Sequence, residues 1–147
     1  MKLLLTLFIT LLLTTCDFLF GVNSLDEIRD SCALAYYQYA QAEVSKGKQG
    51  FPKAIKFLNM ADSIEPQNAV ILHERGLIKF SSRQDNEGAF KDLELSIEYS
   101  MDENDKLTRY HNRGLCYYQI GELDKACADW SKAGESGEVY IEKYCNK

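Results

Sequence analysis

Hydrophobic, small and charged positions recur along this chain in three copies of about 34 to 38 residues. The segment His73-Glu74-Arg75-Gly76-Leu77 returns 38 residues later as His111-Asn112-Arg113-Gly114-Leu115. The segment Ala89-Phe90-Lys91-Asp92-Leu93 returns 37 residues later as Ala126-Cys127-Ala128-Asp129-Trp130. An earlier copy of this second half is Ala54-Ile55-Lys56-Phe57-Leu58. Self-similarity at this spacing is typical of stacked repeat architectures, in which each copy is one supersecondary unit.

Each copy is predicted to form two helices. In the last copy the apolar spacing favours helices over about residues 107–120 and 123–133, with Gly121 as the break between them. Pro66 is expected to end the second helix of the first copy, and Asn68 is suited to cap the helix that follows. Ser24 is similarly suited to cap a long first helix from residue 25 to about residue 46.

These positions resemble the tetratricopeptide repeat. The last copy agrees with that pattern at Tyr110, Gly114, Tyr117, Gly121, Leu123, Ala126, Trp130 and Ala133. The resemblance implies an all-α fold, an α-α superhelix (solenoid) of three helical hairpins over about residues 33–66, 69–102 and 107–134. A capping helix over residues 138–145 completes a domain of residues 25–147. The first helix of the first copy allows two registers: Tyr36, Ala40 and Gly47 fit with a two-residue insertion, and Ala42 fits without one.

Small residues at repeated positions have a physical role in such a hairpin. Gly114 with Ala126, and Gly76 with Ala89, allow the two helix backbones to approach closely. Beside them, we expect ion pairs between Arg75 and Asp92 and between Arg113 and Asp129. The alternative is a set of solvated charges that contribute about 0–1 kcal/mol. The first copy carries Tyr39 and Phe57 at the comparable positions and is predicted to lack the ion pair.

The resemblance also implies that the first helix of each hairpin lines a concave groove. The position three residues before each glycine, and the positions that follow it on the same face, are then candidates for binding a protein or peptide partner. These candidates are Tyr37, Gln41, Val44, His73, Leu77, Phe80, His111, Leu115 and Tyr118. The alternative is that they are ordinary solenoid residues, or residues covered by the long first helix. Basic residues that clamp a C-terminal carboxylate in chaperone-binding members of the family are absent from these positions.

The N-terminus has the layout of an export signal. One basic residue, Lys2, precedes an apolar stretch from Leu3 to Leu13, which is short for a membrane-spanning helix of roughly 20 residues. Residues 13–16 resemble the lipobox of bacterial lipoproteins, which implies a signal peptide of residues 1–15, lipidation at Cys16 and a linker over residues 16–24. Thr15 departs from the small residue usual there. Cleavage after Ser24 (signal 1–24) and an uncleaved membrane anchor are the alternatives.

Composition and motifs argue against several function classes. A net charge of −5 disfavours nucleic-acid binding, because phosphates would be repelled. No phosphate-binding glycine loop, nucleophile turn or paired-cysteine zinc motif is visible in the sequence. We therefore predict no enzyme activity, no catalytic residues, no metal site and no cofactor.

Five cysteines raise the question of disulfides. Cys127 and Cys145 meet if the capping helix folds back, and in an oxidising compartment they could form a bridge worth roughly 3 kcal/mol. The alternative is two buried thiols. Cys32 and Cys116 lie in non-adjacent repeats and are expected to stay unpaired.

The sequence as a whole favours an exported, membrane-tethered scaffold that binds a protein. Its overall pattern, with the Lys143-Tyr144-Cys145 ending, resembles bacterial envelope proteins of the Bacteroidetes type, which implies a lipid-anchored, periplasmic or secreted protein. A small-ligand carrier that uses the aromatic groove, and a structural subunit of an envelope complex, are the alternative functions. The two differ in what they should display: a closed cavity with convergent polar groups, or exposed apolar surface.

Overall fold

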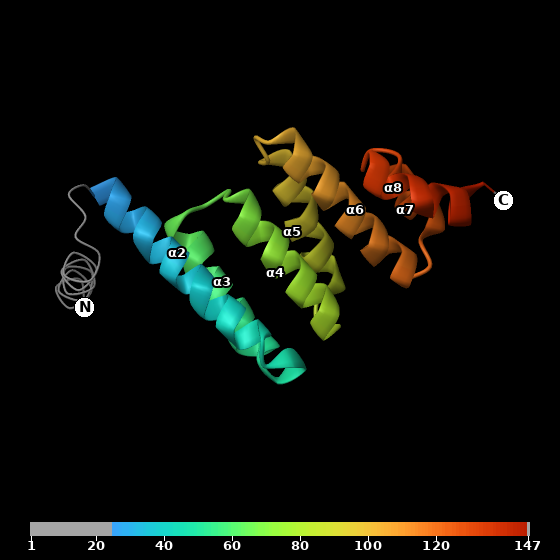
Figure 1. The fold of residues 1–147 in the computed structure, drawn as a ribbon. Helices are drawn as coiled ribbons and strands as arrows, with labels where there is room; N and C mark the ends of the chain where they lie inside the picture. Colours follow the sequence, from blue (N-terminus) through green and yellow to red (C-terminus); the bar gives the residue numbers. More distant parts are fainter. Residues whose placement is uncertain (1–24, 147) are drawn as a thin grey trace. The chain divides into compact units, whose positions relative to one another are not determined.

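A computed structural model describes residues 25–146, and this part of the chain is helical without strands. The α-helices are α2 (Leu25–Val44), α3 (Phe51–Ile64), α4 (Ala69–Ser82), α5 (Asn86–Glu98), α6 (Glu103–Gln119), α7 (Leu123–Trp130) and α8 (Glu135–Tyr140). A short 3-10 helix (Gly47–Gln49) precedes α3, and a π-helical turn (Ile141–Cys145) follows α8. Consecutive helices pack as hairpins, α2 with α3, α4 with α5 and α6 with α7, which confirms the all-α fold (Figure 1). The predicted signal segment and Cys16 lie outside the described residues.

The chain divides into two compact units, and residues up to Pro66 form the first. Its core is built from small residues on both helices together with one leucine: Ala33, Ala40, Ala54, Leu58 and Ala61. Tyr36 stacks on Phe57 with ring centroids 6.3 Å apart, which closes one side of this hairpin. Small side chains on both helices allow the backbones to lie close, so the unit needs few large residues in its core.

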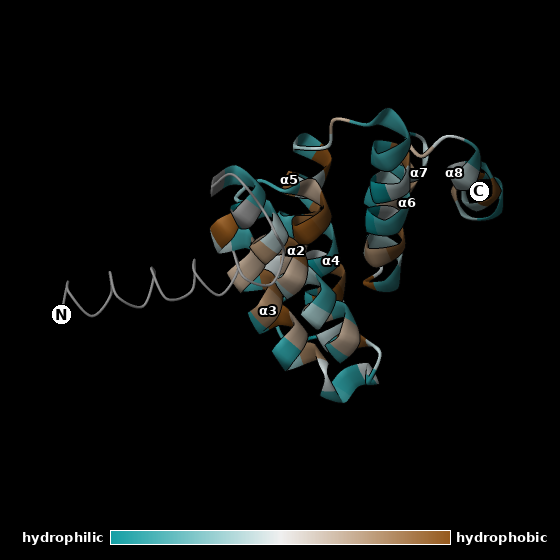
Figure 2. Cartoon of the chain, turned by 60° about the vertical axis from the view of Figure 1, so that its left-hand side comes forward, coloured by the Kyte–Doolittle hydropathy of each residue, from teal (hydrophilic) through white to brown (hydrophobic). Residues whose placement is uncertain are grey.

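The second unit runs from Gln67 to the C-terminus and holds the other two hairpins with the C-terminal helices. Its central cluster consists of Phe80, Ala89, Leu93 and Cys116, with Leu77 and Phe90 packed against it. Phe90 on α5 stacks on Tyr117 on α6, with centroids 4.4 Å apart, so one aromatic pair joins successive hairpins. Coloured by hydropathy, α6 is largely hydrophilic (Figure 2).

Side-chain caps begin α4, α5 and α6. The Asn68 side chain accepts hydrogen bonds from the backbone amides of Val70 and Ile71, as predicted. Gly121 has a positive φ of 84°, a conformation that glycine adopts without strain, and it ends the α6 turn. Helix α6 starts four residues earlier than predicted because the Asp102 carboxylate accepts a hydrogen bond from the amide of Asp105.

The structure settles the register of the first hairpin. Ala40 is fully buried, whereas Ala42 is exposed, so the alignment with the two-residue insertion is the one that the fold adopts. The inserted residues lie in the turn that contains Gly47–Gln49. Gly50 follows this turn, and a Cβ atom there would collide with the carbonyl oxygen of Glu43. Glycine at this position therefore allows the chain to re-enter α3 against the end of α2.

Within residues 25–146, no helix has the combination of length and hydropathy needed to span a membrane.

Candidate functional site

The helix-crossing points of the second and third hairpins have the close contacts that the sequence predicts. A Cβ atom added to Gly76 would lie 2.8 Å from Leu93 Cγ and 3.0 Å from the Ala89 carbonyl oxygen. A Cβ atom added to Gly114 would lie 2.7 Å from Trp130 Nε1. These distances are too short for a methyl group, so each glycine is needed for the approach of its two helices.

Both predicted ion pairs are present. Arg75 donates two hydrogen bonds to Asp92, from Nε at 2.7 Å and from one terminal nitrogen at 2.8 Å, and both side chains are buried. Arg113 donates the same two bonds to Asp129, each at 2.8 Å. Lys79 adds a second cation for Asp92, with Nζ 2.9 Å from Oδ2. Each aspartate carboxylate accepts a hydrogen bond on both oxygens, so it can be buried without an unsatisfied acceptor.

The predicted groove residues of the first hairpin lie on α2 at different depths. Gln41 is exposed and donates a hydrogen bond from Nε2 to the Tyr37 hydroxyl at 3.0 Å. Tyr37 and Val44 are half-buried. These three residues therefore present one polar and two partly apolar groups on the same helix.

In the second hairpin, one predicted groove residue is wrongly assigned. Phe80 is buried, with 9% of its surface exposed, and its ring meets Phe90 edge-on with centroids 5.8 Å apart. It is a core residue and a partner cannot reach it. The periodicity places Phe80 on the inner face of α4, but it does not reveal that α6 closes over that position. Leu77 is half-buried against the same cluster.

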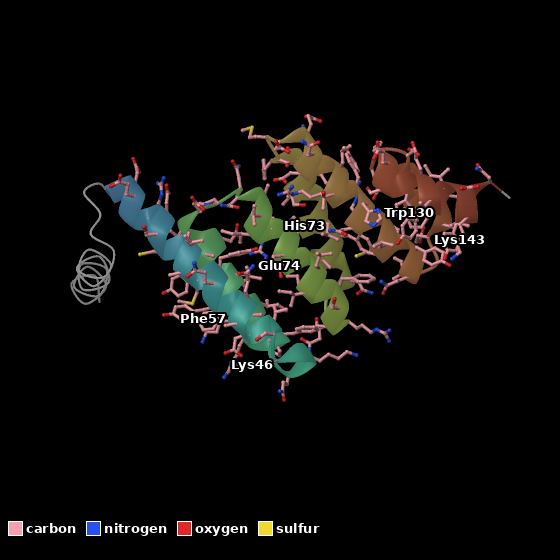
Figure 3. The ribbon with its side chains drawn as sticks, in the orientation of Figure 1. Lys46, Phe57, His73, Glu74, Trp130 and Lys143 are labelled. Carbon is pink, nitrogen blue, oxygen red and sulfur yellow. A yellow bond between two sulfur atoms is a disulfide. The ribbon has the colours of Figure 1, made fainter. Side chains whose placement is uncertain are left out.

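His73 contacts the following hairpin. The residue lies on α4 (Figure 3). Its Nε2 atom lies 3.0 Å from Asn112 Nδ2, and its Nδ1 atom is buried without a hydrogen-bond partner. Burial, reinforced by the positive charge of Arg109, lowers the pKa of His73 to about 4, while Asp105 acts in the opposite direction. The imidazole is therefore neutral at pH 7.

Sequence reasoning did not single out Arg109, which is buried and has an Nε atom without a hydrogen-bond partner.

The C-terminal segment packs against two predicted groove residues of the third hairpin, His111 and Tyr118, although Tyr118 remains 40% exposed. The rings of His111 and Tyr140 meet edge-on at 5.1 Å, and those of Tyr118 and Tyr144 lie 4.6 Å apart. Leu115 is half-buried on the same helix. One alternative from the sequence was that the long first helix covers the groove residues. In the third hairpin, it is α8 and the π-helical turn that pack against them. Part of the surface proposed for a partner is thus occupied by the chain itself.

The cysteines follow the prediction only in part. Cys127 and Cys145 form a disulfide with Cα atoms 5.9 Å apart, so the C-terminal segment does fold back onto α7. Cys116 is a free, buried thiol, and burial raises its pKa to about 11. Cys32, expected to be unpaired, is instead disulfide-bonded. The prediction for Cys32 was wrong because the repeat pattern carries no information about disulfide pairing.

Within the described part of the chain, no group of three or more histidine, cysteine, aspartate or glutamate side chains converges to hold a metal ion. No family model, curated protein or solved structure matches the chain.

Proposed function

We propose that this protein is an exported α-solenoid of three tetratricopeptide-type repeats that holds a protein partner on the first helices of its hairpins. The proposal includes tethering to a bacterial envelope membrane through an N-terminal anchor, and it assigns no reaction to the chain. It gives the observed hairpins a role typical of helical repeats, which present extended binding surfaces rather than enclosed active sites.

The observation that carries the proposal is the duplication of one hairpin design. Two consecutive hairpins place a glycine at the helix crossing and a doubly hydrogen-bonded arginine–aspartate pair beside it. An identical arrangement at identical repeat positions supports a repeated structural unit. Repeated units of this kind leave the side chains of their first helices free to vary with the partner.

The accessible candidate residues support a protein or peptide partner more than a small ligand. Gln41 is exposed, and Tyr37, Val44 and Leu77 are half-buried. A mixture of half-buried apolar groups and exposed polar groups is common in protein interfaces. A carrier would instead need an enclosed apolar cavity with a few convergent polar groups.

Site-specific photo-crosslinking tests the partner surface. A photoreactive residue at Gln41 on α2 is compared with one at Glu94, an exposed position on α5, the second helix of its hairpin. We expect a discrete crosslinked protein from Gln41 and none from Glu94, and the purified partner should bind the chain directly. Equal crosslinking from both positions, or none from Gln41 in cells that produce the folded protein, would contradict the proposal.

Tethering is tested separately with Cys16→Ala. If Cys16 carries lipid, the substitution should release the chain from the membrane fraction and remove the acyl mass from the mature protein. Cleavage after Ser24 would give a mature chain that begins at Leu25 and is soluble in both forms. Mass spectrometry of the protein purified from membranes distinguishes lipidation from cleavage after Ser24. A membrane-bound chain in which Cys16 is unmodified would instead support the third alternative, an uncleaved N-terminal anchor.

A further inference from the structure

The C-terminal segment, residues 135–145, packs like a bound ligand against the third hairpin. Its two aromatic residues, Tyr140 and Tyr144, are four positions apart and half-buried. Tyr140 lies 4.8 Å from Trp130 and 5.1 Å from His111, measured between ring centroids. Tyr144 lies 4.6 Å from Tyr118 and 6.0 Å from Trp130. We call the surface formed by His111, Tyr118 and Trp130 the aromatic face.

Apart from these rings, the segment buries few side chains, and Gly137 packs directly against the Trp130 backbone. Gly137 is its one buried residue in α8, and the π-helical turn that follows has none. Val139 is 66% exposed. The segment also leaves His111 Nδ1 buried without a hydrogen-bond partner, which is costly for a polar atom. The fit to the aromatic face is therefore incomplete at this atom, and a ligand that places a hydrogen-bonding group here would improve on it.

One covalent bond holds the far end of this segment in place. The Cys127–Cys145 disulfide joins the end of the π-helical turn to α7, and both cysteines are half-buried rather than enclosed in the core. A dithiol can reduce such a bridge: the Sγ–Sγ bond breaks, two electrons and two protons pass to the cysteines, and the dithiol becomes a cyclic disulfide. After reduction, the only covalent connection between the segment and the rest of the described chain is the backbone at the Gly134 turn, where φ is +60°.

We propose that residues 135–145 are a disulfide-locked ligand of the chain itself, which a dithiol reductant releases so that the aromatic face can bind a partner's helical segment. The occupant is a helix with two aromatic side chains four residues apart, the chemistry of Tyr140 and Tyr144. The inference rests on the proposed function, because it assigns part of the partner surface to a regulated state.

The single tryptophan reports on this release. Trp130 is fully buried, so acrylamide should quench its fluorescence weakly in the oxidised chain. The double variant Cys127→Ser with Cys145→Ser opens the lock without a reductant and leaves the disulfide of Cys32 intact. We expect its quenching constant to rise at least threefold. Cys116→Ser is the matched control, because it removes a free thiol and should leave quenching unchanged.

Binding is tested with a synthetic peptide of residues 135–146 that carries serine in place of Cys145. We expect the peptide to bind the full-length double variant at least tenfold more tightly than the oxidised wild-type chain, and peptide with alanine at Tyr140 and Tyr144 to lose that gain. Equal binding to both proteins, or unchanged quenching in the double variant, would overturn the lock. If the double variant instead forms dimers in which residues 135–145 of one copy bind the aromatic face of the other, the proposal that this face binds a different protein would be overturned.

Hydrogen exchange covers the case in which the variant unfolds. Reduction of the wild-type chain should raise amide exchange at least tenfold over residues 135–145 and leave α6 and α7 protected. Loss of protection throughout α6 and α7 would show that the bridge maintains the fold, and the proposal would fail. None of these outcomes changes the crosslinking result from Gln41, so failure of the lock and failure of the scaffold proposal are distinguishable.

Discussion

Tyr39 contacts Phe57 across the first hairpin, with ring centroids 5.6 Å apart, at the two positions that the other hairpins give to an arginine and an aspartate. The same site in the repeat is thus filled by two different kinds of interaction. The exposure differs as well, since Tyr39 is 59% exposed while Arg75 and Asp92 are buried. At the exposed position of the first hairpin, an aromatic contact without an ion pair is tolerated. At the buried position of the second hairpin, a charged side chain must be paired, because burying an unpaired charge is costly.

The first prediction follows from that exposure. Replacing the aromatic pair by Tyr39→Arg with Phe57→Asp should form an ion pair that is screened by water and worth about 0–1 kcal/mol. A double-mutant cycle of the free energy of unfolding measures this coupling. A coupling energy above about 3 kcal/mol, the range of buried pairs, would contradict the explanation by exposure.

The two arginine–aspartate pairs, in which both aspartates are buried, should respond unequally to loss of their arginine. Arg113→Met leaves Asp129 without its cation, and such a change typically costs about 3–5 kcal/mol. Arg75→Met should cost less, because Lys79 remains 2.9 Å from Asp92. Chemical denaturation of both variants checks the order, and Lys79→Met combined with Arg75→Met should remove the difference. A larger loss for Arg75→Met alone would show that Lys79 does not compensate.

A methyl group at the third crossing point should be destabilising. Gly114→Ala places Cβ 2.7 Å from Trp130 Nε1, and overpacking of this kind costs roughly 1–3 kcal/mol, partly offset by about 1 kcal/mol of helix propensity. Trp130 cannot easily move, since Tyr118 and Tyr140 pack against it. Thermal unfolding and Trp130 fluorescence measure the effect. An unchanged melting temperature and emission spectrum would show that the crossing has room to spare.

His73 should make stability depend on pH. Its pKa is about 4 in the folded chain against about 6.5 unfolded, so protonation favours the unfolded chain. The contribution is complete above pH 6.5 and is lost as the pH falls from 6.5 towards 4, by at most about 3 kcal/mol. We expect wild-type protein to lose about 2 kcal/mol more than His73→Gln between pH 7.5 and 5. Parallel pH profiles for the two proteins, measured by urea unfolding, would contradict the assignment.

The buried thiol of Cys116 should react slowly. Burial raises its pKa to about 11, so at pH 8 its thiolate fraction is roughly a hundredfold or more below that of an ordinary cysteine. Iodoacetamide should leave Cys116 unmodified in the native, unreduced chain and modify it once the chain is unfolded. Mass spectrometry of the two samples is the measurement. Equal modification in both would mean that the packing between α4, α5 and α6 opens readily.

The fold within each hairpin is predictable from the sequence because its determinants repeat locally. Gly76, Gly114 and their arginine–aspartate neighbours recur at fixed spacing, and helix geometry turns that spacing into a shared face. The Cys127–Cys145 bridge was predictable for a related reason, since Cys127 lies on one helix and Cys145 ends the next short segment. In these cases the partner of each residue is within about 20 positions along the chain.

Only the tertiary structure decided what covers each hairpin from outside. It buried Phe80 under the next hairpin, placed Asn112 against His73, and laid Tyr140 and Tyr144 over the aromatic face. It also showed that Cys32 is bridged, against expectation. Periodicity predicts which face of a helix is apolar, but any of several apolar segments of the chain can pack against that face. The choice among them depends on shape and on long-range packing, which a local pattern of residues does not contain.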